Sequence, residues 1–313
     1  MRKRRTVSRW FSELLMRAAM ASGVGYLAAA YTVSRWLTRP TRRQISVPRN
    51  AAKWACEPLE CRTCDGVRLA GWAIAPPAPR GNVILFHGMR HHREKLLGRI
   101  GLLAGAGYRC IAFDHRAHGE SGGRRTSFGY YESKDVEAVL ELSGNRWPAE
   151  PSAALGISMG AAALCFAASK TRRLRAIVLE SLYYDVESAF RSRIGTHYPA
   201  WFKRLSPTVV WVTEKRLKLR IKQINPAEHI GGLAPAPLLL LTGMNDLHAS
   251  PREALRLYHR YPGPRELWLV PGAGHRDLFE TAGSDYGRRV LGFLQRHLRG
   301  DADGPSALLS TSA

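Results

Sequence analysis

Residues 153–164 read "AALGISMGAAAL", in which Ser158 stands between Gly156 and Gly160. The segment is too apolar for a loop, and its two glycines interrupt any continuous helix or strand. A short strand that turns sharply into a helix, with the serine at the corner, explains every residue in it. The spacing G-x-S-x-G is typical of a corner that exposes the serine hydroxyl above the N-terminus of the next helix.

Short apolar runs alternate with helical patterns on both sides of this corner. The runs have the composition of strands buried on both faces of a parallel sheet. A further pair of strands over 59–74 is joined by an Asp65-Gly66 turn. The alternation predicts the α/β class, with a mostly parallel central sheet and helices on both faces. The strand-like runs are 82–88, 108–123 with its glycine-rich loop, 175–181, 237–243 and 265–275, and the helical patterns are 94–107, 130–144 and 286–298.

The chain divides into three parts by composition. Inside the middle part, residues 184–236 interrupt the alternation with four prolines, and we expect this insertion to form a helical lid above the sheet. Val210, Leu217, Ile221 and Ile224 fall on one helical face within it. The three parts are a basic N-terminal segment over 1–53, an α/β domain over 54–299 and a small, polar, disordered tail over 300–313.

The formal net charge is +22, and half of it lies in residues 1–53, which hold twelve Arg or Lys and one acid. A basic surface of this kind can bind nucleic acid. However, the chain has no zinc-finger spacing, aromatic RNA-binding signature or repeated basic heptad. We therefore expect no nucleic-acid partner.

Residues 18–34 carry no charge and are bounded by Arg17 and Arg35. As a helix this segment would cover about 26 Å, against a bilayer core of about 30 Å. We expect an uncleaved, single-pass membrane anchor here, without a defined orientation. Three alternatives stay open: a signal peptide cleaved after Ala28-Ala29-Ala30 with export of the protein, a twin-arginine signal beginning at Arg4-Arg5, and a helix packed on the domain or lying on a membrane.

A serine alcohol attacks poorly unless a base, itself oriented by an acid, lies within hydrogen-bond reach. On this type of sheet the chain order is serine, then acid, then histidine. Asp246 follows one predicted buried strand and His275 follows the next, so both share the rim of the sheet with Ser158. His248, His259 and His229 are weaker candidates for the base, and Glu180, Asp185 and Asp277 are alternative acids.

At these residues the sequence resembles the α/β-hydrolase superfamily, especially its monoacylglycerol-lipase-like and serine-aminopeptidase-like branch. The resemblance runs from about residue 60 to 298 and has one departure, Ala117 in place of a usual glycine. It implies Ser158 as nucleophile, His275 as general base and acid, Asp246 as the orienting carboxylate, and the backbone N–H groups of Met89 and Met159 as the oxyanion hole. The motifs are "FHG" (86–88), "DHRAHGESGG" (114–123), "GISMG" (156–160), "GMND" (243–246) and "GAGH" (272–275).

Two side-chain clusters raise the question of a metal. In the family, His87 and the 114–119 segment brace loops around the site, which disfavours a metal formed with His91 and His92. Cys61 and Cys64 have CxxC spacing, but positions three apart on a strand point to opposite faces. We expect neither a metal nor a cofactor, because the serine route needs none.

The expected function is hydrolysis of a carboxylic ester through an acyl-enzyme intermediate. The substrate would be a small ester, and the basic residues of 215–222 make a lipid-like one attractive. A serine peptidase or amidase on the same fold is the alternative, followed by a non-catalytic binding protein of this fold.

Overall fold

The computed structural model describes residues 23–46, 54–190 and 200–298, and for residues 200–205 it describes the backbone alone. Eight strands form the main sheet, in the order β10-β9-β8-β7-β4-β5-β3-β2. Strands β1 and β6 form a separate two-stranded pair. The strands are β1 (Thr41–Arg42), β2 (Ala55–Arg62), β3 (Arg68–Ala75), β4 (Asn82–Phe86), β5 (Arg109–Phe113), β6 (His118–Gly119), β7 (Ser152–Ile157), β8 (Leu174–Glu180), β9 (Leu238–Gly243) and β10 (Arg265–Val270).

The sheet is mostly parallel, as expected. In this sheet only β3 runs against the direction of the other strands, pairing antiparallel with both β2 and β5, while the pairs from β5 through β10 are all parallel. The predicted turn between β2 and β3 is present, with Gly66 at a φ of 80°. The helices of the described residues that have both ends defined are α2 (Leu97–Gly105), α3 (Ser133–Arg146), α4 (Met159–Phe166), α6 (Ala200–Leu217), α7 (Pro226–His229), α8 (Pro251–Arg260), α9 (Leu278–Ala282) and α10 (Ser284–Leu298).

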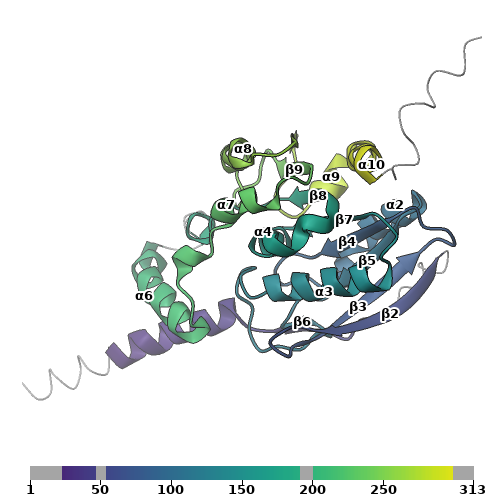
Figure 1. Ribbon diagram of the computed structural model, residues 1–313. Helices are drawn as coiled ribbons and strands as arrows, with labels where there is room; N and C mark the ends of the chain where they lie inside the picture. Colours follow the sequence, from purple (N-terminus) through teal and green to yellow (C-terminus); the bar gives the residue numbers. More distant parts are fainter. Residues whose placement is uncertain (1–22, 47–53, 191–199, 299–313) are drawn as a thin grey trace, which may run out of the picture.

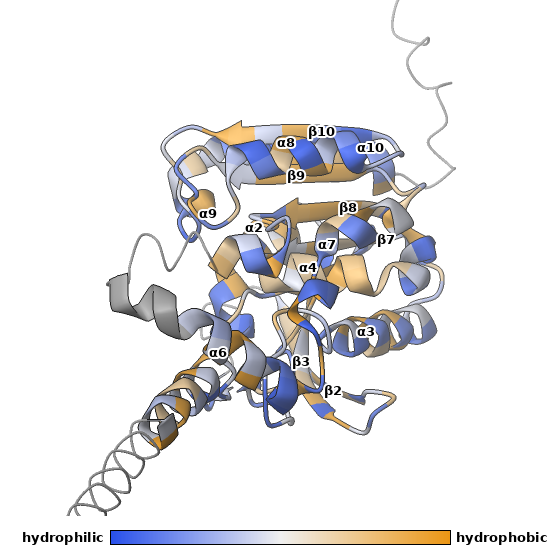
Figure 2. Ribbon diagram, turned by 90° about the vertical axis from the view of Figure 1, so that its left-hand side faces the viewer, coloured by the Kyte–Doolittle hydropathy of each residue, from blue (hydrophilic) through white to orange (hydrophobic). Residues whose placement is uncertain are grey.

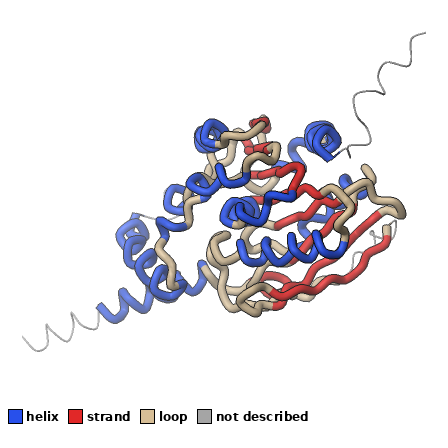
Figure 3. Tube along the Cα trace, viewed as in Figure 1, coloured by secondary structure: helices blue, strands red, loops and turns tan. Residues whose placement is uncertain are grey.

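Each face of the sheet has its own hydrophobic core, because side chains alternate along every strand. In β4, Ile84 and Phe86 pack with α3 and α4 on one face, whereas Val83 and Leu85 pack with α2 and α10 on the other. Figure 1 shows α3 and α4 together in front of the sheet, and Figure 3 shows the layers of helix and strand without side chains. The wholly apolar runs in the sequence thus reflect burial on both faces.

The prediction of a single-pass membrane anchor over 18–34 is wrong. No helix within the described ranges is long and apolar enough to cross a bilayer. Residues 23–37 form a helix that lies beside α6, with Ala30, Ser34 and Leu37 buried (Figures 1 and 2). Residues 18–22 lie outside the described part of the chain. The membrane contact predicted for the N-terminal segment is therefore not supported.

Polar contacts explain why this helix packs on the protein. Ser34 is fully buried, and its Oγ accepts hydrogen bonds from Arg216 Nη1 at 2.9 Å and lies 2.9 Å from Thr213 Oγ1. Arg216 also donates to Thr38 Oγ1 at 3.0 Å. Small polar residues that look neutral in a hydropathy pattern thus serve as hydrogen-bonding positions in a helix–helix contact.

The described residues of the insertion over 184–236 are largely helical, with one difference from the expected pattern. Helix α6 ends at Leu217, and Lys218 follows with a φ of 54°. Ile221 therefore lies in a separate short 3-10 helix, Ile221–Gln223, and is buried there. The role of the insertion as a lid and the domain limits stay predictions, and the proposed tail over 300–313 lies outside the described residues.

Candidate active site

Ser158 occupies the corner between β7 and α4. Its φ of 51° and ψ of −107° are unusual for a residue with a side chain and indicate local strain. A Cβ on Gly160 would lie 2.4 Å from the carbonyl oxygen of Phe86, and one on Gly156 would lie 2.7 Å from the backbone nitrogen of Ala161. Only glycine fits at both positions, which explains the spacing of the motif.

The loops after β9 and β10 are packed against each other. Asn245 N–H donates to the carbonyl oxygen of Ala273 at 2.8 Å. A Cβ on Gly243 would lie 2.2 Å from that same oxygen, so the backbones touch directly. This contact brings Asp246, in the loop after β9, next to His275, in the loop after β10.

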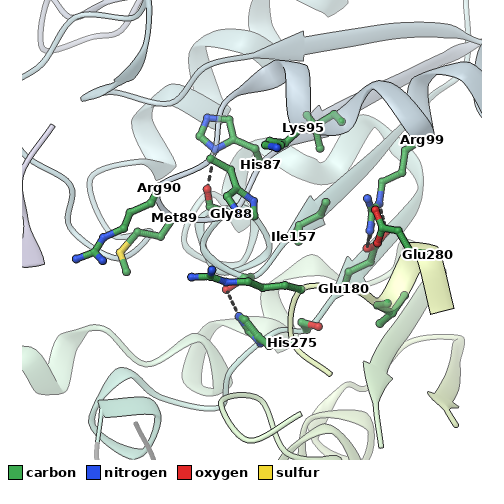
Figure 4. A pocket seen from close by; sticks show the side chains of 16 residues that line it. His87, Gly88, Met89, Arg90, Lys95, Arg99, Ile157, Glu180, His275 and Glu280 are labelled. Carbon is green, nitrogen blue, oxygen red and sulfur yellow. Dashed lines mark hydrogen bonds and ion pairs between the residues drawn. The ribbon is translucent and has the colours of Figure 1, made fainter. Parts of the chain in front are cut away.

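Ser158, His275 and Asp246 form a continuous hydrogen-bonded row. Ser158 Oγ lies 3.0 Å from His275 Nε2, and His275 Nδ1 lies 2.8 Å from Asp246 Oδ2. Figure 4 shows His275 facing the loop of His87 and Gly88 across the pocket. The three residues that the sequence analysis singled out are thus within hydrogen-bond reach of one another.

The environment of Asp246 keeps it ionised. Burial alone would raise the pKa of this carboxyl, but the hydrogen bond from His275, together with hydrogen bonds from backbone N–H groups, outweighs that effect and leaves the pKa below its usual value. Backbone N–H groups of His248 and Ala249 also donate to Asp246 Oδ1, at 2.8 and 2.9 Å. An ionised carboxylate only accepts, so His275 carries its proton on Nδ1 and leaves Nε2 free to accept from the serine hydroxyl.

The alternative acids are engaged elsewhere. Glu180 pairs with Arg99, whose Nη2 lies 2.6 Å from Glu180 Oε2. Asp185 accepts from Ser188, and Asp277 accepts from Gly274 N–H at 2.6 Å.

Among the alternative bases, only His248 approaches the row, and its ring packs edge-on against His275 with 5.2 Å between the ring centres. His229 instead contacts Phe166, and His259 contacts Tyr258.

The backbone N–H groups expected to form an oxyanion hole flank Ser158. Met159 is the first residue of α4, so its N–H has no carbonyl acceptor within the helix. A Cβ on Gly88 would lie 3.6 Å from Ser158 Cβ, which puts the Gly88-Met89 backbone directly against the serine. Both methionines line the cavity beside Ser158 and His275.

The buried histidines hold this backbone in place. His87 donates from Nδ1 to the carbonyl oxygen of Gly88 at 2.8 Å and accepts from His115 N–H at 3.0 Å. His118 accepts from Arg90 N–H at 3.1 Å. Each ring is occupied by loop backbone, and the described residues contain no cluster with the makeup of a metal site.

Two cavities of opposite character meet at Ser158 and His275. One, of about 60 Å³, is lined mainly by apolar side chains, among them Phe128, Tyr183 and Phe190. The other, of about 280 Å³, is polar and contains Lys95, Arg99, Glu180 and Arg276 (Figure 4). The site therefore offers different surroundings to the two parts of a substrate.

Sequence reasoning gave no role to several residues that line these cavities, among them Arg99 and Ser181, and named Glu180 only as an alternative acid. Arg99 and Glu180 gave a signal, because each is a charge within an otherwise apolar helix or strand, and such charges are buried only when paired. Ser181, at 1 % exposure and with a φ of 49°, gave none. Its conformation depends on the end of β8 and cannot be read from neighbouring residues.

Several of the known proteins to which this chain is similar are described as hydrolases. A family model described as "Serine aminopeptidase, S33" matches residues 77–229, or 153 of the 313 residues. The uncharacterized protein YqkD of Bacillus subtilis is 26% identical over 73% of this chain and 76% of its own length. A monoacylglycerol lipase of Mycolicibacterium smegmatis is 34% identical over 30% of this chain and 35% of its own.

The fold has close counterparts among solved structures. The esterase Pf2001 of Pyrococcus furiosus superposes with a TM-score of 0.70 at 24% sequence identity, covering 83% of this chain and 98% of that one. Together with the sheet order and the serine corner, this similarity assigns the α/β-hydrolase fold to the protein.

Proposed function

We propose that this protein is a serine hydrolase that cleaves carboxylic esters through an acyl-enzyme intermediate. The observation that carries the proposal is the row formed by Ser158, His275 and Asp246, with distances of 3.0 and 2.8 Å. The similarity to hydrolases, including an esterase and a monoacylglycerol lipase, supports the same reaction class.

The proposed reaction has two halves. Ser158 Oγ attacks the ester carbonyl carbon while its proton passes to His275 Nε2, and the N–H groups of Met89 and Met159 stabilise the resulting oxyanion. The C–O bond to the alcohol then breaks, and His275 gives its proton to the departing oxygen. Water next loses a proton to His275 and attacks the acyl-serine, which releases the carboxylic acid and restores the serine.

Charge in the polar cavity favours an ester over an N-terminal peptide as substrate. A site for a free amino group needs an unpaired carboxylate, but the buried Glu180 is already paired with Arg99. The cavity also contains Arg90, Lys95 and Arg276 against the single further carboxylate Glu280. An ammonium group would be repelled there. The small apolar cavity beside Phe128 favours a short acyl chain.

Labelling with a fluorophosphonate probe tests the proposal directly. We expect the wild-type protein to be labelled and the Ser158→Ala variant to be unlabelled, because the probe phosphonylates an activated serine. Ser169→Ala, which changes an exposed serine outside the cavities at Ser158, is the matched control and should retain labelling. Labelling that persists in Ser158→Ala would contradict the assignment.

A substrate series then separates ester from amide hydrolysis. p-Nitrophenyl esters of increasing chain length should be cleaved, with the shorter acyl chains preferred, and aminoacyl p-nitroanilides should be cleaved far more slowly. Faster turnover of the aminoacyl amides would favour the peptidase alternative, which the family description brings forward.

A further inference from the structure

The polar cavity beside Ser158 has two cations that are not neutralised. Among the residues that the structure describes, Lys95 and Arg276 form no ion pair with a carboxylate, although both line this cavity. Arg99, in contrast, is held by Glu180, with Nε–Oε1 and Nη2–Oε2 separations of 3.0 and 2.6 Å. The exposed Glu280 is the carboxylate left to offset them, so the field in the cavity is positive.

The Arg90 guanidinium is held at Trp36 and does not serve a ligand in the cavity. Its guanidinium stacks over the ring of Trp36 at 4.0 Å and donates to the Trp36 carbonyl oxygen at 3.3 Å. The cations available to a ligand are therefore Lys95, from the short helix before α2, and Arg276, from the loop after β10. They approach the cavity from two separate elements.

A buried hydroxyl in the same cavity has no hydrogen-bond partner. Ser181 is 1 % exposed, and its Oγ is unsatisfied among the described residues. Its backbone N–H donates to the carbonyl oxygen of Leu241 at 2.8 Å, and its φ is 49°. An unpaired buried hydroxyl is costly, so a ligand oxygen that accepted from it would recover that free energy.

His91 lies in the same positive field. Burial lowers the pKa of this histidine, and the charges of Arg276 and Lys95 lower it further, to about 4. At neutral pH the ring is therefore uncharged, and it retains one N–H that can donate to a ligand oxygen. The cavity thus combines two cations with neutral donors.

We propose that this cavity is a subsite for an anionic group, such as a carboxylate, on the ester that Ser158 cleaves. Lys95 and Arg276 would supply charge, and Ser181 would donate a hydrogen bond to one oxygen of the anion. The inference rests on the proposed function, because it places the anion and the scissile ester in one ligand.

Two matched pairs of esters test the subsite and identify which half of the ester carries the charge. Monobutyl glutarate and butyl glutaramate differ only by carboxylate against carboxamide on the acyl half. The butyrate esters of 4-hydroxybutanoate and of 4-hydroxybutanamide differ in the same way on the alcohol half. The polar cavity receives one half of the ester, so only the pair that carries its charge on that half should discriminate. For that pair we expect the wild-type kcat/KM to favour the carboxylate ester over its amide partner about tenfold at low salt.

This preference should fall toward unity in the Lys95→Ala and Ser181→Ala variants and in the Lys95→Ala, Arg276→Ala double variant. Lys95→Ala is informative by itself, because Arg276 adjoins His275 and its replacement can disturb that ring. Lys170→Ala removes an exposed cation outside the cavity and should keep the wild-type preference. High salt should weaken the preference, as expected for exposed charges.

Binding without turnover separates failure of the subsite from failure of the proposed function. Calorimetric titration of Ser158→Ala should show tighter binding of the preferred carboxylate ester than of its amide partner, whether or not the wild type hydrolyses either. Equal affinities for both members of both pairs, or a preference that survives the double variant, would overturn the subsite. Absence of fluorophosphonate labelling and of hydrolysis alongside selective binding would instead overturn the hydrolase proposal and leave an anion site.

Discussion

The rim of the sheet and the contact between the N-terminal helix and α6 are built in different ways. At the rim, backbones touch at Gly160 and Gly243, where a Cβ would lie 2.4 and 2.2 Å from a carbonyl oxygen. At the helix contact, the elements are joined by side-chain hydrogen bonds from Thr213 and Arg216 to Ser34. Direct backbone contact permits a single arrangement of the segments at the rim. The side-chain hydrogen bonds of the helix contact, in contrast, can be lost one at a time.

The largest effect is expected at the rim, on catalysis. Asp246→Asn removes the charge that keeps the His275 proton on Nδ1, so the imidazole loses its ability to accept from Ser158. We expect kcat for a p-nitrophenyl ester to fall about 10⁴-fold with little loss of stability. Steady-state kinetics and thermal unfolding measure the two quantities.

Asp277→Asn is the matched control for this change, because Asp277 lies two residues past His275 and caps the loop at Gly274. Its effect on kcat should be within a few-fold. A larger loss of kcat in Asp277→Asn than in Asp246→Asn would contradict the assignment of Asp246 as the acid that orients His275.

The second effect concerns stability and tests whether the rim tolerates any added atom. Gly160→Ala forces a methyl group against the Phe86 carbonyl oxygen, and we expect a loss of about 3 kcal/mol or more in the free energy of unfolding. Gly101→Ala, in α2, adds the same methyl group where no atom lies within 4 Å. It should stabilise the protein by about 0.5–1 kcal/mol. Equal effects in denaturant titrations would show that the corner is looser than its geometry implies.

This difference between the two regions also decides what could be predicted from the sequence. Gly156, Ser158 and Gly160 act within one strand and one helix, so their local pattern predicts the corner. Asp246 and His275 follow wholly apolar strands, and strands of a parallel sheet end at one rim. The topology of the sheet therefore brings together Ser158 and His275, which are 117 positions apart in the chain.

The N-terminal helix lacked such a signal. Its uncharged residues match a short membrane span as well as a packed helix, and the choice depends on Thr213 and Arg216, which lie 179 and 182 positions from Ser34. The same limit applies to Ser181 and Lys95, whose meeting in one cavity is a matter of tertiary packing. The local sequence pattern predicts the helices and strands and the residues that share the rim of the sheet. It does not predict which residues the exposed or polar side chains will contact.

The smallest effect is expected at the helix contact and tests whether its hydrogen bonds hold the helix to the domain. Ser34→Ala removes an acceptor that is fully buried and leaves Arg216 and Thr213 with one partner fewer. We expect the free energy of unfolding to fall by about 1–2 kcal/mol. Thr32→Ala changes an exposed hydroxyl on the same helix, which donates to the Ala28 carbonyl oxygen one turn away, and should cost less than about 0.5 kcal/mol.

Esterase activity should be unchanged in both variants, because neither residue lines the cavities at Ser158. Equal stability losses in the two variants would mean that the helix contributes through its own propensity and not through its contact with α6. Hydrogen exchange at the amides of 30–38 distinguishes these cases, since loosening of the contact in Ser34→Ala speeds exchange there while the strands of the sheet stay protected. A helix whose protection depends on Arg216 belongs to the folded domain, and its small, polar residues are explained by that packing.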